Sequence, residues 1–298
     1  QNMIDLHLET YVTEKERRAL EGSLLRTIAR VTYINSVAAE IAGELDRNNI
    51  KVLFLKGMAL ETLVYGARGL RQMNDIDILV SPSDALKAKE ILSTLGFTDT
   101  PLKSPLFRKI LLEMGNHLPE MRRSGISVDI HFRLFGYMAA GITAGAIKYP
   151  QEIIISGKTY YILPPQIALM SMVKHIMKHE DKGEFQLRLY CDTFLLLRKF
   201  SGNILDENLL KYARQAGIES EVERHLAVMK EVFKVAVPAM LLPGHEKTLV
   251  IRDLFFRNMD NPGKVMKPGW GAVYRATLKS IKGIRPRLIF ILGDAFPS

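Results

Sequence analysis

Residues 52–80, VLFLKGMALETLVYGARGLRQMNDIDILV, decide the fold of this chain, because they predict a strand, a helix, a loop and a second strand in succession. Residues 52–55 form a short run of β-branched, aromatic and aliphatic side chains that is typical of a strand. Residues 58–65 are compatible with a helix, and residues 66–74 with a loop. The second strand is expected from about residue 76 to residue 80.

Two carboxylates accompany this second strand. Side chains of a strand alternate between its faces, so Asp75 and Asp77 point to one side while Ile76 and Ile78 point into a core. Neighbouring carboxylates repel each other unless a cation lies between them, which makes the pair a natural ligand set for Mg²⁺ or Mn²⁺. The spacing alone is weak evidence, since about one Asp-x-Asp pattern is expected by chance in a chain of this size.

The residues around the aspartate pair strengthen this interpretation. Gly57 opens the predicted helix, whose free backbone N–H groups suit a phosphate. Lys56 and Arg71 supply cations close by in the sequence. Lys56 also fits a solvated strand end, and this alternative stays open.

A third carboxylate lies in residues 127–132, SVDIHF, which alternate in the same way and predict another strand. Asp129 and His131 share one face of this strand, and the apolar side chains share the other. The sequence therefore predicts three aspartates and one histidine that face the same side of a sheet.

This layout resembles that of the polymerase-β-like nucleotidyltransferase superfamily. The segments LKGMAL, LRQMNDIDILV, a helix that leads to LGF, and VDIHFRL are similar to the bacterial "uncharacterised nucleotidyltransferase" family. The resemblance covers residues 53–134 well and continues more weakly into the later part. One departure is the pair Gly57 and Met58, where the superfamily usually has Gly-Ser. A hydroxyl contact to the triphosphate is therefore missing, and Lys56 or Arg71 is the candidate substitute.

The resemblance implies an α+β fold, with a mixed-sheet nucleotidyltransferase domain over residues 1–164 and an α-helical domain over residues 165–298. It also implies the Mg²⁺-dependent transfer of a nucleoside monophosphate from an NTP to an acceptor, which is a small molecule, a protein or an RNA. The expected mechanism uses two metal ions bridged by Asp75 and Asp77, with Asp129 completing the second site. The implied catalytic and metal-binding residues are Asp75, Asp77 and Asp129, and the implied nucleotide-binding residues are Lys56, Gly57, Arg71 and His131. For His131, orienting Asp129 and contacting the substrate directly are both open. We expect Arg71→Ala to weaken nucleotide binding and to leave thermal unfolding nearly unchanged.

Periodicity predicts the other elements of the chain. Turn residues between alternating segments indicate two β-hairpins, whose strands are given below, and Pro164-Pro165 ends the part of the chain that bears strands. The predicted helices cover residues 14–48, 84–96, 106–114, 167–177, 185–200, 209–216, 222–235 and 270–284, and the predicted hairpin strands cover residues 116–122 with 126–134 and 152–155 with 159–163.

His175 and His179, with Asp192 further on, suggest a metal site, because residues four apart lie on the same helix face. Two histidines without a convincing third ligand are more often exposed or hydrogen-bonded to a neighbour. The family resemblance offers another interpretation, since the family has a His-x-x-x-His helix followed by an aspartate at about this distance. It implies that Lys174, His175, Lys178 and His179 line the nucleotide or acceptor cleft.

The formal net charge is +9, with 41 Lys and Arg against 32 Asp and Glu, and most of the excess follows His245. Such a basic C-terminal part suits nucleic acid or another polyanion, but it also fits a solvated face. The single cysteine, Cys191, excludes an internal disulfide and fits a reducing cytosol, so we expect a cytoplasmic protein. No apolar run reaches the ~18 residues that a membrane helix requires, and we expect no membrane insertion.

Several enzyme classes are disfavoured by the motifs. We find no nucleophile elbow, no Walker pattern and no dinucleotide fingerprint. The alternative to a transferase is a non-catalytic module that keeps the fold and binds nucleic acid or a partner protein. The missing serine and the basic C-terminal part motivate this alternative, and steep salt dependence of nucleic-acid binding would favour it.

Overall fold

The computed structural model describes residues 12–99, 111–136, 139–155 and 157–260. Its centre is one mixed sheet with the strand order β3-β4-β5-β2-β1-β7-β6. The pairs β2 with β5 and β1 with β7 are parallel, and the other neighbours are antiparallel. The strands are β1 (Leu53–Phe54), β2 (Asp75–Leu79), β3 (Thr98–Asp99), β4 (Met121–Arg123), β5 (Ile126–His131), β6 (Gln151–Ile155) and β7 (Lys158–Ile162).

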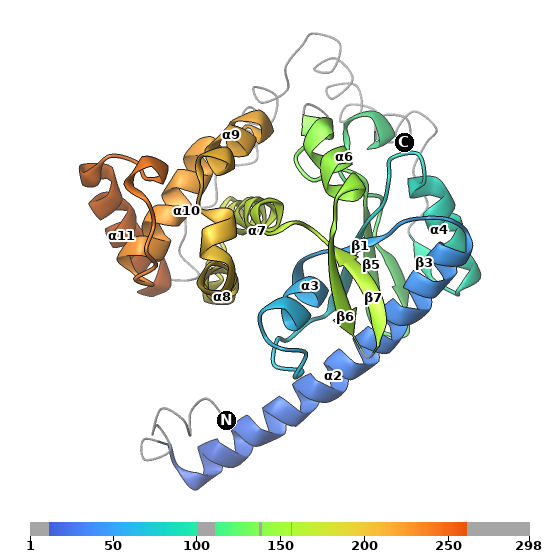
Figure 1. The fold of residues 1–298 in the computed structure, drawn as a ribbon. Helices are drawn as coiled ribbons and strands as arrows, with labels where there is room; N and C mark the ends of the chain where they lie inside the picture. The colour runs from blue at the N-terminus through green and yellow to red at the C-terminus, as the bar shows by residue number, and fades with distance from the viewer. Residues whose placement is uncertain (1–11, 100–110, 137–138, 156, 261–298) are drawn as a thin grey trace.

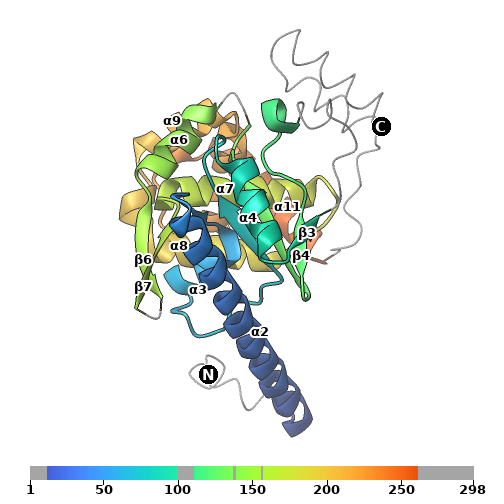
Figure 2. The same cartoon turned by 90° about the vertical axis from the view of Figure 1, so that its right-hand side faces the viewer.

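Helices α2 (Glu14–Arg47) and α4 (Ala85–Thr94) cover one face of the sheet (Figures 1 and 2). Helix α2 begins with a capping box between Thr13 and Glu16, which satisfies free amides of its first turn. Its later half buries apolar side chains at helical spacing, and its earlier half extends beyond the sheet (Figure 1). In β2, Ile76 and Ile78 are fully buried, as predicted for the core face, although Asp77 and Leu79 on the other face are buried as well.

The opposite face of the sheet looks toward the helices that follow the last strand (Figures 1 and 2). These helices are α7 (Pro165–Glu180), α8 (Leu187–Ile204), α9 (Glu207–Ala216), α10 (Glu219–Glu231) and α11 (His245–Asp260). Helix α7 starts with Pro165 at its first position, where the missing N–H costs no hydrogen bond. The expected α+β class, a mixed sheet followed by helices, is confirmed. The division into two domains near residue 164 remains a prediction.

Several local predictions are confirmed and others need correction. Both predicted hairpins are present. Helix α3 (Lys56–Leu63) begins two residues before the predicted start and ends two residues before the predicted end. Helix α6 (Ala140–Lys148) was not predicted, because its run of glycine, alanine and isoleucine has no clear polar face. Residues 106–110 and 270–284 lie outside the described residues. In the described part, no helix combines the length and apolar character needed to cross a membrane.

Candidate functional site

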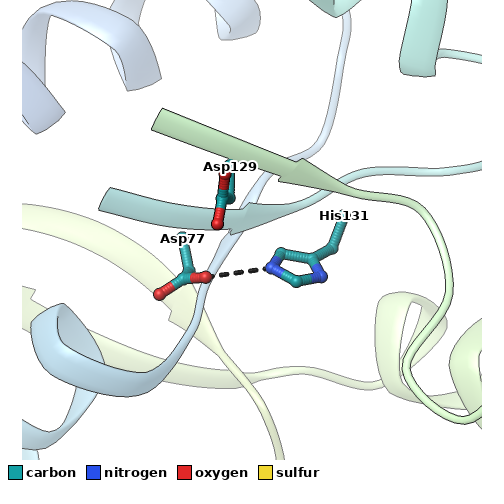
Figure 3. Close-up of side chains that lie close together, drawn as sticks. All are labelled: Asp77, Asp129 and His131. Carbon is teal, nitrogen blue, oxygen red and sulfur yellow. Dashed lines mark hydrogen bonds and ion pairs between the residues drawn. The ribbon is translucent and has the colours of Figure 1, made fainter. Parts of the chain in front are cut away.

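The candidate site forms where β2 and β5 lie side by side in parallel register. This register pairs Asp77 with Asp129, so their side chains point to the same face of the sheet. His131 follows on β5, and the ligand atoms of Asp77, Asp129 and His131 all lie within 4.8 Å of one another. Figure 3 shows the Asp129 carboxylate directed toward Asp77 and the His131 ring beside it.

Asp77 is the electrostatic centre of this cluster. It is 3% exposed, and its Oδ1 accepts hydrogen bonds from Lys56 Nζ at 2.5 Å and from His131 Nε2 at 2.9 Å. Burial by itself would raise the pKa of Asp77, but Lys56 and His131 outweigh burial and lower it below its usual range. Burial lowers the pKa of His131, although Asp77 opposes that shift. Asp77 is therefore ionised and offers a negative charge to this face of the sheet.

Asp75 is placed differently from the other two aspartates. It lies on the same face of β2 as Asp77, but it is exposed and does not belong to the cluster of Asp77, Asp129 and His131. Partial desolvation and the nearby Asp77 charge raise the pKa of Asp75. His131 thus lies in the close group with Asp77 and Asp129, while Asp75 lines the pocket beside Asp77, and its role as a metal ligand remains a prediction.

Helix α3 starts beside the cluster with free backbone N–H groups. Its N-cap residue is Leu55, which has no polar side chain to cap the first turn. Lys56 has a φ of 43°, a left-handed conformation that is uncommon for a residue with a side chain. The backbone at Lys56 therefore turns sharply between β1 and α3 while its ammonium group pairs with Asp77.

Gly57 leaves room for Arg71. A Cβ atom at Gly57 would lie 2.6 Å from Arg71 Nη1 and 2.9 Å from Met73 Sδ, both closer than van der Waals contact allows. The guanidinium group therefore lies directly against the first turn of α3. The positive charge of Arg71 adds to the partial positive charge of this helix end.

Arg71 is not a solvated loop cation. It is 7% exposed, and its Nε and Nη2 donate to the fully buried Asp192 on α8, with Nη2 to Oδ2 at 2.8 Å. Tyr65 Oη also donates to Asp192, at 2.8 Å. This buried ion pair argues against the expectation that Arg71 contributes little to stability, because removal of Arg71 leaves a buried carboxylate without its cation. In the described part of the chain, Arg71 Nη1 has no hydrogen-bond acceptor.

Glu61 on α3 holds the loop that carries Arg71. Its carboxylate accepts backbone hydrogen bonds from Gly69 at 2.5 Å, Leu70 at 3.3 Å and Arg71 at 2.7 Å. Glu61 is 1% exposed, so these amides supply its hydrogen-bonding partners in place of water. The sequence analysis did not single out Glu61, although an acidic residue inside an apolar helix is a signal that could have indicated its buried role.

Two pockets flank Lys56. The first is about 200 Å³ and runs between the start of β2 and helices α7 and α8. Its lining includes three of the four predicted nucleotide-binding residues, Lys56, Gly57 and Arg71, but not His131. The lining also includes Asp75, Asp77, His175, His179, Arg188 and Asp192. The second is about 490 Å³ and lies between the end of β5 and α7, with Lys56, His117, His131, Lys174, His175 and Lys178 in its lining. All four residues predicted on α7 thus line one or both pockets.

The sequence also suggested a metal site at His175, His179 and Asp192, but the structure pairs these residues differently. The two rings are in contact at 4.7 Å between centroids, and His179 Nδ1 lies 2.6 Å from Glu184. Asp192 is bound by Arg71. In the described part of the chain, the only group of three or more side chains placed to share a metal ion is that of Asp77, Asp129 and His131.

The chain is similar in structure to several solved nucleotidyltransferases. The solution structure of the antibiotic-resistance factor ANT(2″)-Ia is 13% identical, with a TM-score of 0.35 and coverage of 78% of this chain and 94% of that chain. The crystal structure of ANT(2″)-Ia with adenylyl-2″-tobramycin is 12% identical, with a TM-score of 0.31, and the match covers 78% of this chain and 99% of that chain. An antigenic nucleotidyltransferase-like protein from Paracoccidioides brasiliensis is 14% identical, with a TM-score of 0.41, and the match covers 70% of this chain and 94% of that chain.

No curated protein matches the chain. A protein family described as "Uncharacterised nucleotidyltransferase" matches residues 1–234, which is the stretch that contains the whole sheet, the aspartate cluster and helices α7 to α10. The chain therefore belongs to this family of nucleotidyltransferases.

Proposed function

We propose that this protein is a Mg²⁺-dependent nucleotidyltransferase, also served by Mn²⁺, that moves a nucleoside monophosphate from an NTP to an acceptor. The observation that carries the proposal is the parallel register of Asp77 and Asp129, which places two carboxylates side by side next to Lys56 and Arg71. Carboxylates that face phosphate-binding cations are what this chemistry needs, since phosphoryl transfer depends on positioning and charge neutralisation.

The donor atoms suit a hard divalent cation. Asp77 and Asp129 would hold the ion, with Asp75 at the open side of the pocket and substrate phosphates in the remaining positions. When bound, the ion supplies charge neutralisation to the phosphates and lowers the pKa of the acceptor hydroxyl. His131 is a positioning residue in this proposal, because its hydrogen bond to Asp77 fixes the direction of that carboxylate.

We place the triphosphate in the first pocket. Lys56 Nζ, the uncapped amides at the start of α3 and Arg71 Nη1 are donors that suit phosphate oxygens. They take over the role of the hydroxyl that Met58 lacks. The acceptor oxygen attacks the α-phosphorus, the bond from that phosphorus to the leaving oxygen breaks, and pyrophosphate departs. In this proposal Asp129 takes the acceptor proton.

Incubation with each α-labelled NTP and Mg²⁺ or Mn²⁺ tests the proposal, against a small-molecule extract, RNA and protein as acceptors. We expect label transfer with the native protein and a loss of roughly 10²-fold or more in Asp77→Asn, because that change removes a charged ligand. The matched control is Asp253→Asn, an exposed aspartate on α11.

Transfer that persists in Asp77→Asn would overturn the assignment of the metal site. Absence of both label transfer and metal-dependent NTP binding would overturn the enzyme proposal. The basic C-terminal part begins at His245, and its residues from 261 onward lie outside the described residues, so nucleic-acid binding by it remains a prediction.

A further inference from the structure

The second pocket has a different character from the first. It lies between the end of β5 and helix α7, and Lys56 and His175 line both pockets. We call it the lysine pocket, because its lining also includes Lys174, Lys178 and Lys182. Its volume of about 490 Å³ lies in the range of small-molecule sites, which is about 300–1,000 Å³.

Lys56 pairs with Asp77, but the other three lysines of the lysine pocket are not balanced by acids. In the described part of the chain, no carboxylate lies within ion-pair distance of Lys174, Lys178 or Lys182. The only acidic residue in the lining is the exposed Asp181. A concentration of positive charge without nearby carboxylates attracts anions.

Among the three lysines, Lys174 is partly buried and held in a fixed position. Its Nζ donates to the Leu134 carbonyl at 3.0 Å and lies 5.6 Å from the centroid of the Phe135 ring, so it is held in place with donors to spare. Burial and the nearby Lys178 lower the pKa of Lys174 to about 8, so it still carries its charge at neutral pH. A partly buried cation without an anionic partner is costly, and a bound anion would remove that cost.

The imidazoles of the lysine pocket connect it to the aspartate cluster. The rings of His117 and His131 lie 5.3 Å apart between centroids, and His131 bonds Asp77. His117 Nδ1 donates to the Leu118 carbonyl at 2.9 Å, which in the neutral ring leaves Nε2 as an acceptor. A molecule in the lysine pocket therefore lies next to His131, which is hydrogen-bonded to Asp77 of the cluster.

We propose that the lysine pocket binds the acceptor, and that the acceptor is a small molecule with a phosphate or carboxylate group held by Lys174 and Lys178. The inference rests on the proposed function, in which the NTP occupies the first pocket. The acceptor hydroxyl then faces the α-phosphorus across Asp77 and Asp129. Its oxygen forms the new bond to phosphorus as pyrophosphate leaves, and its proton passes to Asp129.

Binding of two anions to the full-length protein, observed by NMR, tests the inference. Reductive ¹³C-methylation labels every lysine and keeps its charge, and the variants Lys174→Arg and Lys178→Arg assign the two signals. Inorganic phosphate and citrate are titrated separately at constant ionic strength, which distinguishes a phosphate from a carboxylate preference. A non-hydrolysable NTP with Mg²⁺ is then added to saturation.

We expect phosphate, citrate or both to shift the signals of Lys174 and Lys178 and not that of Lys211, an exposed lysine on α9. Lys178→Glu should raise the dissociation constant of the anion by roughly 10- to 100-fold, whereas Lys211→Glu should leave it unchanged. The nucleotide should shift the Lys56 signal, leave the anion bound, and bind Lys178→Glu as tightly as the native protein.

Competition between the nucleotide and the anion, or a matching loss of NTP affinity in Lys178→Glu, would show that the lysine pocket holds the triphosphate and would overturn the inference. Absence of any shift at Lys174 and Lys178 with either anion would overturn it as well. Anion binding at these lysines without any NTP binding would leave the anion pocket standing and would instead count against the proposed function.

Discussion

Arg71 and Asp192 form a buried ion pair that ties the loop before β2 to helix α8, although 121 residues separate them in the sequence. Nε and Nη2 of the guanidinium both donate to the carboxylate, and neither residue is more than 7% exposed. The pair lines the pocket in which we place the NTP. The same interaction therefore joins the sheet to the helices and holds Arg71 Nη1 beside Gly57.

We predict that Arg71→Ala is strongly destabilising. Removing one partner of a buried ion pair leaves the other charge uncompensated, which typically costs about 3–5 kcal/mol of the free energy of unfolding. Urea denaturation followed by circular dichroism measures this change. The double variant Arg71→Met with Asp192→Leu should recover much of the loss, because it removes both charges. An unfolding midpoint of Arg71→Ala equal to that of the native protein would contradict the prediction.

Gly57→Ala should weaken NTP binding by displacing the guanidinium of Arg71. The new Cβ would lie 2.6 Å from Nη1, so Arg71 must shift, and overpacking of this kind typically costs about 1–3 kcal/mol. Titration with a fluorescent NTP analogue measures the affinity. Gly145→Ala on α6 is the matched control, because its Cβ would meet no atom within 4 Å and the change should be neutral or slightly stabilising.

Glu61→Ala should loosen the loop that carries Arg71. Three backbone N–H groups, those of Gly69, Leu70 and Arg71, lose their common acceptor, and hydrogen bonds to a charged group are worth about 1.5–3 kcal/mol each. Hydrogen exchange of these three amides should become faster, and NTP affinity should fall. Glu61→Gln retains an acceptor oxygen and should show a smaller effect on both. Unchanged exchange rates in Glu61→Ala would show that the loop is held by other contacts.

His225 should make the protein less stable in mild acid. Burial lowers the pKa of this fully buried ring to about 3, and its Nε2 donates to Thr193 Oγ1 at 2.8 Å. The unfolded chain takes up the proton below a pH of about 6.5 and the folded chain does not, so stability is fully present above that pH and falls toward pH 3.

The slope that this one group contributes is up to about 1.4 kcal/mol per pH unit within this interval. Urea denaturation between pH 7.5 and pH 4 should show a smaller slope in His225→Asn than in the native protein. The slope should not vanish, because burial also lowers the pKa of His175 to about 3. An identical slope in both proteins would show that His225 does not remain neutral in the folded state.

The sequence was sufficient for most of the described elements and for the faces of the strands that bear the aspartates. Alternation placed Asp77 and Asp129 opposite the core, and the structure confirms that they are neighbours in parallel register. The turn residues predicted both hairpins, and the change from alternation to helical spacing after Pro164 predicted the helical part. These features depend on residues that are close in the chain, so a local pattern records them.

Which side chains contact each other in the site was decided by the tertiary structure alone. The sequence placed Arg71 in a loop near the aspartates. It did not reveal that Nε and Nη2 of Arg71 would donate to Asp192, or that Nη1 would lie against Gly57. The sequence placed His131 on the face of the aspartates, but it did not reveal that this ring would hydrogen-bond Asp77. Such contacts join segments far apart in the chain and depend on the packing of α8 and β5 against their neighbours. Local periodicity determines which face a side chain occupies, whereas only the packed fold determines what it meets there.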